Sequence, residues 1–238
     1  MNIETQFKQL RLHGMNRSWL ALAETRKLHE LTFTEGMEVL LQAESDDRDG
    51  KRFERLQLNA NFRYRASIEE LKMDAKRGLD KATVAVFATG EYIPKGEAIL
   101  ICGSTGTGKS FLASALGHHA CTQGYRVAYF NVQKLLLKTK MSRIDGSVFK
   151  FFEKISKADL LILDDFGLTH LEQQQRIDML EIIEDRHAKK ATIIASQLPV
   201  EKWWDVFGDS TLADAFLDRM VHTSYRIELK GESLRKKR

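Results

Sequence analysis

Apolar residues recur at intervals of three and four from residue 3 to residue 41, the spacing that places them on one face of a helix. The polar run at residues 44–50 then interrupts this pattern, and a second helical segment is predicted over residues 52–61. No low-complexity linker follows, so this region ends where the pattern next changes. The sequence therefore predicts a small all-helical domain over residues 1–66.

The pattern changes after residue 66. Ser67 and Glu70 have the spacing of a capping box, which predicts that a helix begins there. Beyond it, short apolar or β-branched runs alternate with helical patterns, as in a parallel sheet that helices cover on both faces. The sequence thus predicts an α/β domain over residues 67–238 with a parallel five-stranded sheet. The predicted strands are residues 98–102, 126–130, 160–163, 192–195 and 225–229.

The composition indicates a soluble chain with a real core, because 43% of the 238 residues are hydrophobic and 29% are charged. No apolar run reaches the roughly eighteen residues of a membrane span. The N-terminus lacks the apolar core of a signal peptide, so we expect a cytoplasmic protein without membrane contact. Cys102 and Cys121 have neither metal-ligand nor CxxC spacing, and we expect both to be reduced core residues.

The segment after the first predicted strand matches the phosphate-binding pattern G-x-x-x-x-G-K-[ST] at every fixed position. A helix follows it, and glycines let consecutive N–H groups turn toward a phosphate at a helix N-terminus. We expect Lys109 to reach the β- and γ-phosphates of ATP and the Ser110 hydroxyl to bind Mg²⁺. The predicted nucleotide-binding residues are Gly103, Ser104, Thr105, Gly106, Thr107, Gly108, Lys109, Ser110 and Phe111.

Two carboxylates follow the apolar run of the third predicted strand. Asp164 and Asp165 come directly after Leu163. Ligands of open α/β sheets bind at the carboxyl ends of the strands, where both side chains are expected. We expect Asp164 to hold the metal, through water, and Asp165 to orient a water molecule toward the γ-phosphate. A solvated turn is the alternative interpretation, but it does not explain why acids follow so apolar a run.

These motifs resemble those of the AAA+ ATPases, and within them the IstB-like transposition helpers and the DnaC-type helicase loaders. The resemblance to the IstB-like proteins extends over nearly the whole chain. Its first and last segments lie outside the ATPase motifs, and they favour the transposition helpers. The segments are LRLHGM at 10–15, GSTGTGKSFLASALG at 103–117, LLILDDFG at 160–167, IIASQLP at 193–199, LADAFLDRMVH at 212–222 and RIELKGESLRKK at 226–237.

The resemblance implies further residues near the phosphates. Gln197 stands where many AAA+ proteins have an asparagine that senses the γ-phosphate, and its amide offers the same donor and acceptor. Ser196 is a second candidate for this role, with a hydrogen bond to a neighbouring loop as the alternative. Arg235 is a candidate second sensor, and we expect the chain to end without the helical lid that many AAA+ proteins use.

The resemblance also implies an arginine that completes the ATP site of a neighbouring subunit. Arg219 matches that position, where a guanidinium neutralises charge on the phosphate oxygens. The alternative is an internal ion pair with Asp218 or Asp214. Arg186 is a weaker trans-acting candidate, with capping of its own helix as the alternative.

The net charge of +4 is concentrated in part of the chain. Residues 134–157 carry seven lysines and arginines against two acidic residues, and residues 235–238 are all basic. Such stretches suit a polyanion such as DNA, with solvated helix faces as the alternative interpretation. The predicted DNA-binding residues are Lys138, Lys140, Arg143, Lys150 and Lys154.

The resemblance therefore implies a slow ATPase that binds duplex DNA without sequence preference, assembles on it as a homo-oligomer and delivers it to a cognate transposase. Bound ATP would act mainly as an assembly switch. Three alternatives remain open. One is a helicase loader that binds a helicase and single-stranded DNA, and another is a DNA scaffold that hardly hydrolyses ATP. The third is a small-molecule kinase, against which the paired aspartates argue.

Overall fold

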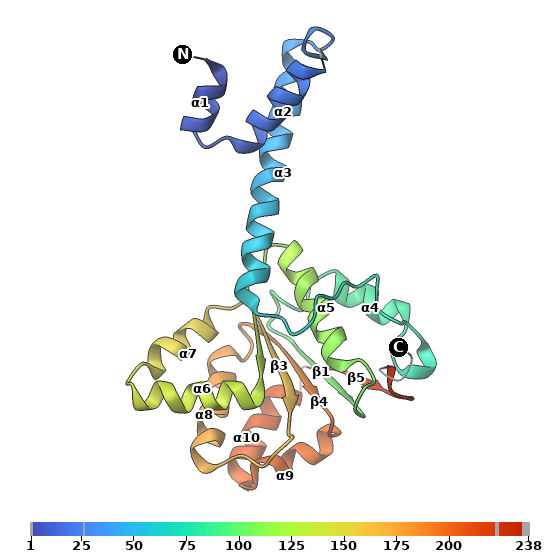
Figure 1. The fold of residues 1–238 in the computed structure, drawn as a ribbon. Coiled ribbons are helices and arrows are strands. Elements are labelled where there is room, and N and C mark those ends of the chain that lie inside the picture. The colour runs from blue at the N-terminus through green and yellow to red at the C-terminus, as the bar shows by residue number, and fades with distance from the viewer. Residues whose placement is uncertain (1, 26, 222–223, 235–238) are drawn as a thin grey trace. The chain divides into compact units, whose positions relative to one another are not determined.

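The computed structural model describes residues 2–25, 27–221 and 224–234. Its contacts divide the chain into two compact units, Met1–Arg55 and Leu56–Arg238, which we call the helical unit and the sheet unit (Figure 1). The sequence predicts the same order of parts with a boundary after residue 66. The contacts instead place the division inside a long helix, because residues 56–66 contact the sheet unit.

The helical unit contains a small apolar core. It comprises α1 (Ile3–Gln9), α2 (His13–Glu24), the short helix η1 (Lys27–His29) and the first part of α3 (Phe33–Ala60). Gly14 of α2 lies so close to α3 that a Cβ atom there would come within 2.2 Å of the carbonyl oxygen of Ala43. Only glycine allows this approach. The core consists of Phe7, Met15 and Leu40, with Leu12, Trp19 and Leu22 packed against it.

The predicted break at residues 44–50 is wrong, because α3 runs through it without interruption. Several polar side chains there have partners along the helix or on the neighbouring helix. Glu44 accepts hydrogen bonds from the backbone N–H groups of Gly14 (2.8 Å) and Met15 (3.2 Å), which caps α2. Asp47 pairs with Lys51 one turn on, at 2.7 Å. Among the described residues, neither α3 nor any other helix is long and apolar enough to cross a membrane.

The sheet unit is built on five parallel strands in the order β2-β3-β4-β1-β5. All of the predicted strands are confirmed, with small differences in their ends. The order places β1 and β3 on either side of β4, so loops that follow these three strands meet at one edge. The strands are β1 (Ala98–Gly103), β2 (Val127–Asn131), β3 (Leu160–Phe166), β4 (Ala191–Ser196) and β5 (Ser224–Leu229).

Helices cover both faces of this sheet (Figure 1). One face packs against α5 (Lys109–Thr122), which also contacts α4 (Lys81–Ala88). The other face carries the larger apolar core, in which alternate strand residues such as Leu100, Leu161 and Ile194 are fully buried. The elements on that side are α6 (Val132–Ile144), α7 (Val148–Ser156), α8 (Gln173–Arg186), η3 (Val200–Lys202), α9 (Trp203–Phe207) and α10 (Ser210–Val221).

The helix predicted to begin at Ser67 does not form. The backbone N–H of Ser67 does donate to the Glu70 carboxylate at 2.9 Å, which is half of a capping box, but only a turn follows. The short helix η2 (Ala75–Arg77) comes next. The first α-helix of this unit is α4, where Asp80 accepts a hydrogen bond from the Thr83 N–H at 2.7 Å. A local capping pattern predicts a turn equally well when no apolar face follows it.

Candidate nucleotide-binding site

The glycine-rich loop lies between β1 and α5, as the sequence predicts. Gly106 and Gly108 have φ angles of +85° and +104°, a backbone conformation that glycine adopts without steric cost. Gly108 is also the N-cap of α5, so the helix begins at the loop and its first N–H groups lie next to the loop. The Lys109 side chain is buried, and its ammonium group donates to the carbonyl oxygen of Ser104 at 2.9 Å.

The structure joins Ser110 to the first carboxylate of β3. The Ser110 hydroxyl donates to Asp164 Oδ1 at 2.8 Å, and the Asp164 side chain is buried. Tyr129 of β2 donates its hydroxyl to the other oxygen, Oδ2, at 2.5 Å. Burial, and then the hydrogen bond to Asp164, raise the pKa of the Tyr129 phenol, so it remains a donor. A hydroxyl oxygen and a carboxylate oxygen in contact form a donor set that suits a hard cation such as Mg²⁺.

A β-bulge interrupts β3 at its two carboxylates. Leu163 pairs with Ile194 and Phe166 with Ser196, so β3 has one more residue than β4 in this interval. Asp165 is in the interval and has a φ of +60°, which aspartate tolerates better than most residues. Asp165 Oδ2 accepts a hydrogen bond from Asn131 Nδ2 at 2.9 Å. Ser110 and Tyr129 thus contact Asp164, whereas Asn131 contacts Asp165.

Gln197, and not Ser196, faces the phosphate loop. The Thr105 hydroxyl donates to Gln197 Oε1 at 2.7 Å. The Ser196 hydroxyl is buried, donates to the carbonyl oxygen of Phe166 (2.8 Å) and accepts from the N–H of Leu198 (3.0 Å). Ser196 therefore has the structural role that the sequence left as its alternative, and it ties the end of β4 to the bulge of β3.

The segment after β5 also reaches the loop. The backbone N–H of Leu234 donates to the carbonyl oxygen of Gly106 at 2.9 Å, and Ser233 fills the space where a Cβ at that glycine would lie. Arg235, the candidate second sensor, lies outside the described residues. Phe111 follows Ser110 on α5, and its ring centroid is 6.2 Å from that of Tyr64.

Arg219 of α10 is engaged within the sheet unit. Its guanidinium forms an ion pair with Glu184 of α8 at 2.7 Å and donates to the carbonyl oxygen of Ala215 at 2.7 Å. The sequence suggested Asp218 or Asp214 as alternative partners, and the pair forms with an acid of another helix instead. About a quarter of the Arg219 side chain is exposed, at 24%.

The prediction that Arg186 could act in trans is wrong. Its side chain is buried, and it donates to the carbonyl oxygens of Ile155, Ala158 and Ala191 at 2.6–2.9 Å. Burial lowers the pKa of its guanidinium to about 10. These carbonyls belong to segments other than α8, so the residue does not cap its own helix either. Arg186 holds the start of β4 to the chain that precedes β3.

We expect Arg186→Met to destabilise the sheet unit by on the order of 3 kcal/mol, because it leaves several buried carbonyls without donors. Urea unfolding followed by circular dichroism measures this loss. Arg126→Ala is the matched control, since the Arg126 side chain is 59% exposed in its ion pair with Asp159 and we expect a loss of less than about 1 kcal/mol there. Equal stability of the Arg186→Met variant and the parent would contradict the structural role.

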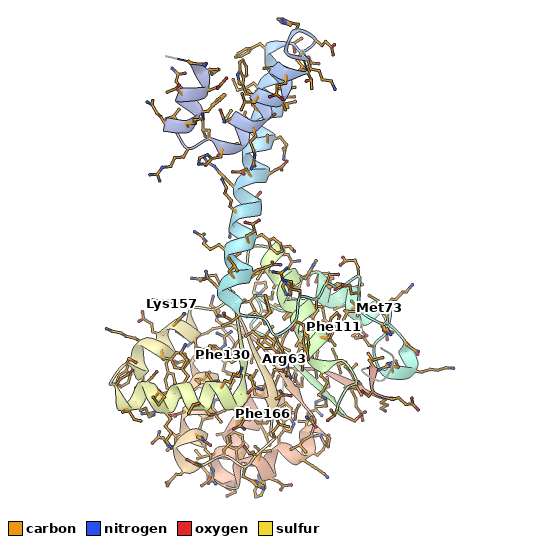
Figure 2. All side chains as sticks on the ribbon, viewed as in Figure 1. Arg63, Met73, Phe111, Phe130, Lys157 and Phe166 are labelled. Atoms are coloured by element: carbon orange, nitrogen blue, oxygen red, sulfur yellow. The ribbon has the colours of Figure 1, made fainter. Side chains whose placement is uncertain are left out.

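Three residues of the site carry no signal that sequence reasoning recognised. Arg63 lies just after α3 (Figure 2). Its guanidinium contacts the Asp164 carboxylate at 3.2 Å and the Asp165 carboxylate at 2.8 Å. Tyr129 and Asn131 come from the end of β2. The rule that ligands gather at the carboxyl ends of strands would have pointed to Asn131. No comparable rule points to Arg63, because it precedes the sheet in a segment without regular structure.

The basic residues predicted to bind DNA fall on α6 and α7. Lys138, Lys140, Lys150 and Lys154 are exposed, whereas Arg143 pairs with the buried Asp178. Arg143 therefore helps to hold α6 on α8, which leaves the four lysines as the stronger candidates.

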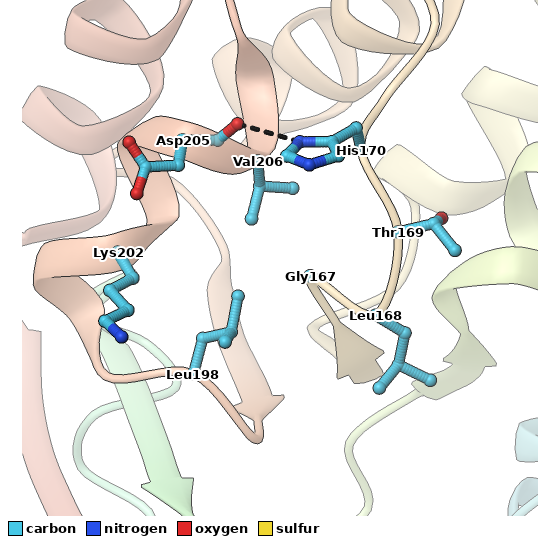
Figure 3. Close-up of a pocket in the computed structure, with 8 residues that line it drawn as sticks. All are labelled: Gly167, Leu168, Thr169, His170, Leu198, Lys202, Asp205 and Val206. Atoms are coloured by element: carbon cyan, nitrogen blue, oxygen red, sulfur yellow. Dashed lines mark hydrogen bonds between the residues drawn. The ribbon is translucent and has the colours of Figure 1, made fainter.

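A cavity of about 250 Å³ lies beyond the ends of β3 and β4 (Figure 3). None of the residues predicted for nucleotide binding lines it. His170 Nδ1 is 3.0 Å from the carbonyl oxygen of Asp205 at its rim. Its lining residues are Gly167, Leu168, Thr169, His170, Leu198, Lys202, Asp205 and Val206.

Comparison with known proteins places this arrangement in a family. The model of the family described as IstB-like ATP binding protein matches residues 5–238. A protein named as an insertion sequence ATP-binding protein, from Sinorhizobium fredii, is 41% identical over 226 residues, which cover 94% of this chain and 92% of that protein. A similarly named protein of Pseudomonas fluorescens is 42% identical over 199 residues, with 82% and 85% covered.

Solved structures share the fold at lower identity. The DnaC helicase loader aligns with a TM-score of 0.58 and 22% identity, over 70% of this chain and 98% of that chain. DnaI aligns with a TM-score of 0.61 and 20% identity, over 70% and 92%. These likenesses show an AAA+ P-loop fold, and the family model and relatives extend over the helical unit as well. The chain belongs to the family of IstB-like ATP binding proteins.

Proposed function

We propose that the protein is an ATP-hydrolysing helper of DNA transposition that assembles on duplex DNA and delivers it to a transposase. One observation supports this most strongly. The phosphate loop, Ser110 and both aspartates meet at one sheet edge, in a chain whose near full-length relatives are named as insertion sequence ATP-binding proteins.

The site residues divide the work by their chemistry. The loop N–H groups and Lys109 would hold the phosphates, and Ser110 with Asp164 would hold Mg²⁺. The ion neutralises charge on the phosphate oxygens when it is bound. Asp165 lies outside that pair and its side chain is partly exposed, so its carboxylate would orient a water molecule. Gln197 faces the loop from the neighbouring strand and would sense the γ-phosphate.

Binding to two kinds of DNA tests this proposal against its nearest rival. Fluorescence anisotropy would compare a duplex and a single strand of equal length, each with and without a non-hydrolysable ATP analogue. We expect tighter binding to the duplex and nucleotide-dependent assemblies in electron micrographs. Preference for single-stranded DNA would favour a helicase loader. Release of phosphate from ATP without a phosphorylated acceptor would exclude a small-molecule kinase.

Neutralising two exposed lysines of α6 should weaken DNA binding. Because each lysine that neutralises a DNA phosphate releases counterions, we expect Lys138→Ala/Lys140→Ala to reduce the slope of log affinity against log salt by about 0.9 for each phosphate that is no longer neutralised. A salt titration by anisotropy measures the slope. Lys72→Ala/Lys81→Ala removes the same charge from exposed positions outside α6 and α7 and should leave the slope nearly unchanged. Equal slopes in both variants would show that the α6 lysines form a solvated helix face and do not contact DNA.

A further inference from the structure

The segment that leaves α3 is fixed to the helix that follows the phosphate loop. His118 of α5 is the anchor, because its Nε2 contacts the carbonyl oxygen of Tyr64 at 3.0 Å and its Nδ1 contacts Gln57 Nε2 at 2.8 Å. One neutral tautomer satisfies both contacts, with Nε2 donating and Nδ1 accepting. Burial lowers the pKa of His118, which favours that neutral ring.

Aromatic packing fixes the same segment a second time. The Phe62 ring lies 4.1 Å from the His118 ring and 6.1 Å from the Tyr129 ring, measured between centroids. Gly117 makes room for it, since a Cβ there would come within 2.5 Å of the Phe62 ring. Asn61, with a φ of +57°, turns the chain at the end of α3. Arg63 is therefore held in position by its neighbours.

In this position the Arg63 guanidinium contacts both carboxylates of β3. A single guanidinium nitrogen, Nη1, lies 3.2 Å from Asp164 Oδ2 and 2.8 Å from Asp165 Oδ2. The other Asp164 oxygen, Oδ1, already accepts from Ser110 and from the Asp165 N–H. The Asp164 side chain is 1% exposed, whereas that of Arg63 is 40% exposed, so the arginine has a route into solvent.

A divalent cation held by Ser110 and Asp164 would place two positive charges beside this guanidinium. Like charges at such short range in a partly buried site repel each other strongly. Arg63 contacts Oδ2 and Ser110 contacts Oδ1, so the two cations would share the negative charge of one buried carboxylate. Metal binding would therefore weaken the contact between Arg63 and Asp164.

We propose that Arg63 competes with the nucleotide's metal for Asp164, so that metal loading releases the segment that joins α3 to the sheet unit. This inference rests on the proposed Mg²⁺–ATP site. It assigns Arg63 a positioning role: the residue holds the two carboxylates in place until the metal replaces it. Release of Arg63 would then couple metal binding at the site to the conformation of the segment that follows α3.

The Mg²⁺ dependence of nucleotide binding tests the competition. A fluorescent non-hydrolysable ATP analogue would be titrated with Mg²⁺ and followed by anisotropy. Because loss of a neighbouring charge shifts a carboxylate equilibrium by about tenfold or more, we expect Arg63→Ala to lower the Mg²⁺ midpoint by at least about tenfold. Arg63→Lys should stay near the parent. Arg65→Ala removes the same charge from an exposed neighbour and should leave the midpoint unchanged.

Hydrogen exchange of the parent protein provides a second readout that needs no variant. We expect the amides of residues 61–65 to exchange faster with Mg²⁺ and the analogue than with the analogue and EDTA. An unchanged midpoint in Arg63→Ala, or slower exchange on metal loading, would overturn the proposal. A raised midpoint would also overturn it and would make Arg63 a phosphate ligand. If the parent itself binds no Mg²⁺–nucleotide, the ATP site fails as well, which separates that outcome from the others.

Discussion

Lys109→Ala should remove measurable ATP binding, since we expect the affinity to fall by roughly a hundredfold or more. Truncating one partner of a buried charge pair costs several kcal/mol. The ammonium group is buried in the loop and already lies against the Ser104 carbonyl. Backbone N–H groups alone cannot replace its charge opposite the phosphates. Isothermal titration with ATP and Mg²⁺ measures the loss.

Asp165→Asn is the comparison that separates binding from hydrolysis. Asparagine keeps the size of the side chain and an oxygen that can accept from Asn131, but it loses the charge that orients a water molecule. We expect this variant to bind ATP and to release phosphate much more slowly than the parent. An equal loss of nucleotide affinity in Lys109→Ala and Asp165→Asn would refute this division of roles.

Arg219→Ala should lose the stimulation of ATP hydrolysis by DNA, by about a thousandfold if the residue acts like the arginines that P-loop enzymes supply in trans. A lone subunit has the phosphate loop and both aspartates but lacks part of the charge that stabilises the transition state. Activity per subunit should therefore rise with protein concentration and with added duplex. ATP affinity should stay close to that of the parent.

The ion pair with Glu184 provides a control that leaves the arginine in place. Glu184→Gln frees the Arg219 guanidinium from its partner within the chain. If Arg219 serves a neighbour, this variant should keep or increase stimulation by DNA. If the arginine only ties α10 to α8, both variants should lose stability alike and neither should affect assembled hydrolysis.

Mixing two inactive variants provides a second control for Arg219. Lys109→Ala subunits still carry the arginine, so they should partly restore hydrolysis at the intact loops of Arg219→Ala subunits. Phosphate release from the mixture on duplex DNA measures this rescue. Normal hydrolysis by assembled Arg219→Ala subunits would show that the residue is a structural ion-pair partner only.

Elements with local signals are predictable from the amino-acid sequence. The strands of the sheet appear as short apolar runs because both faces of a parallel sheet are buried. The phosphate loop was identifiable because its glycines, Lys109 and Ser110 must stand at fixed spacing between a strand and a helix. The same logic located Asp164 at a strand end, next to Ser110 in space.

Contacts between distant residues depend on how the elements pack, and the sequence pattern does not predict them. The polar run 44–50 continues α3 because its carboxylates find partners on α2 and one turn along the helix, contacts that a local pattern does not contain. Arg186 and Arg219 both lie in the last turn of a helix. Arg186 is nevertheless buried and donates to backbone carbonyls, whereas Arg219 pairs with Glu184. Arg63 reaches Asp164 across 101 positions of the chain. Periodicity reports which face of an element is buried, but not which side chain of another element lies against it, because that depends on how the elements pack.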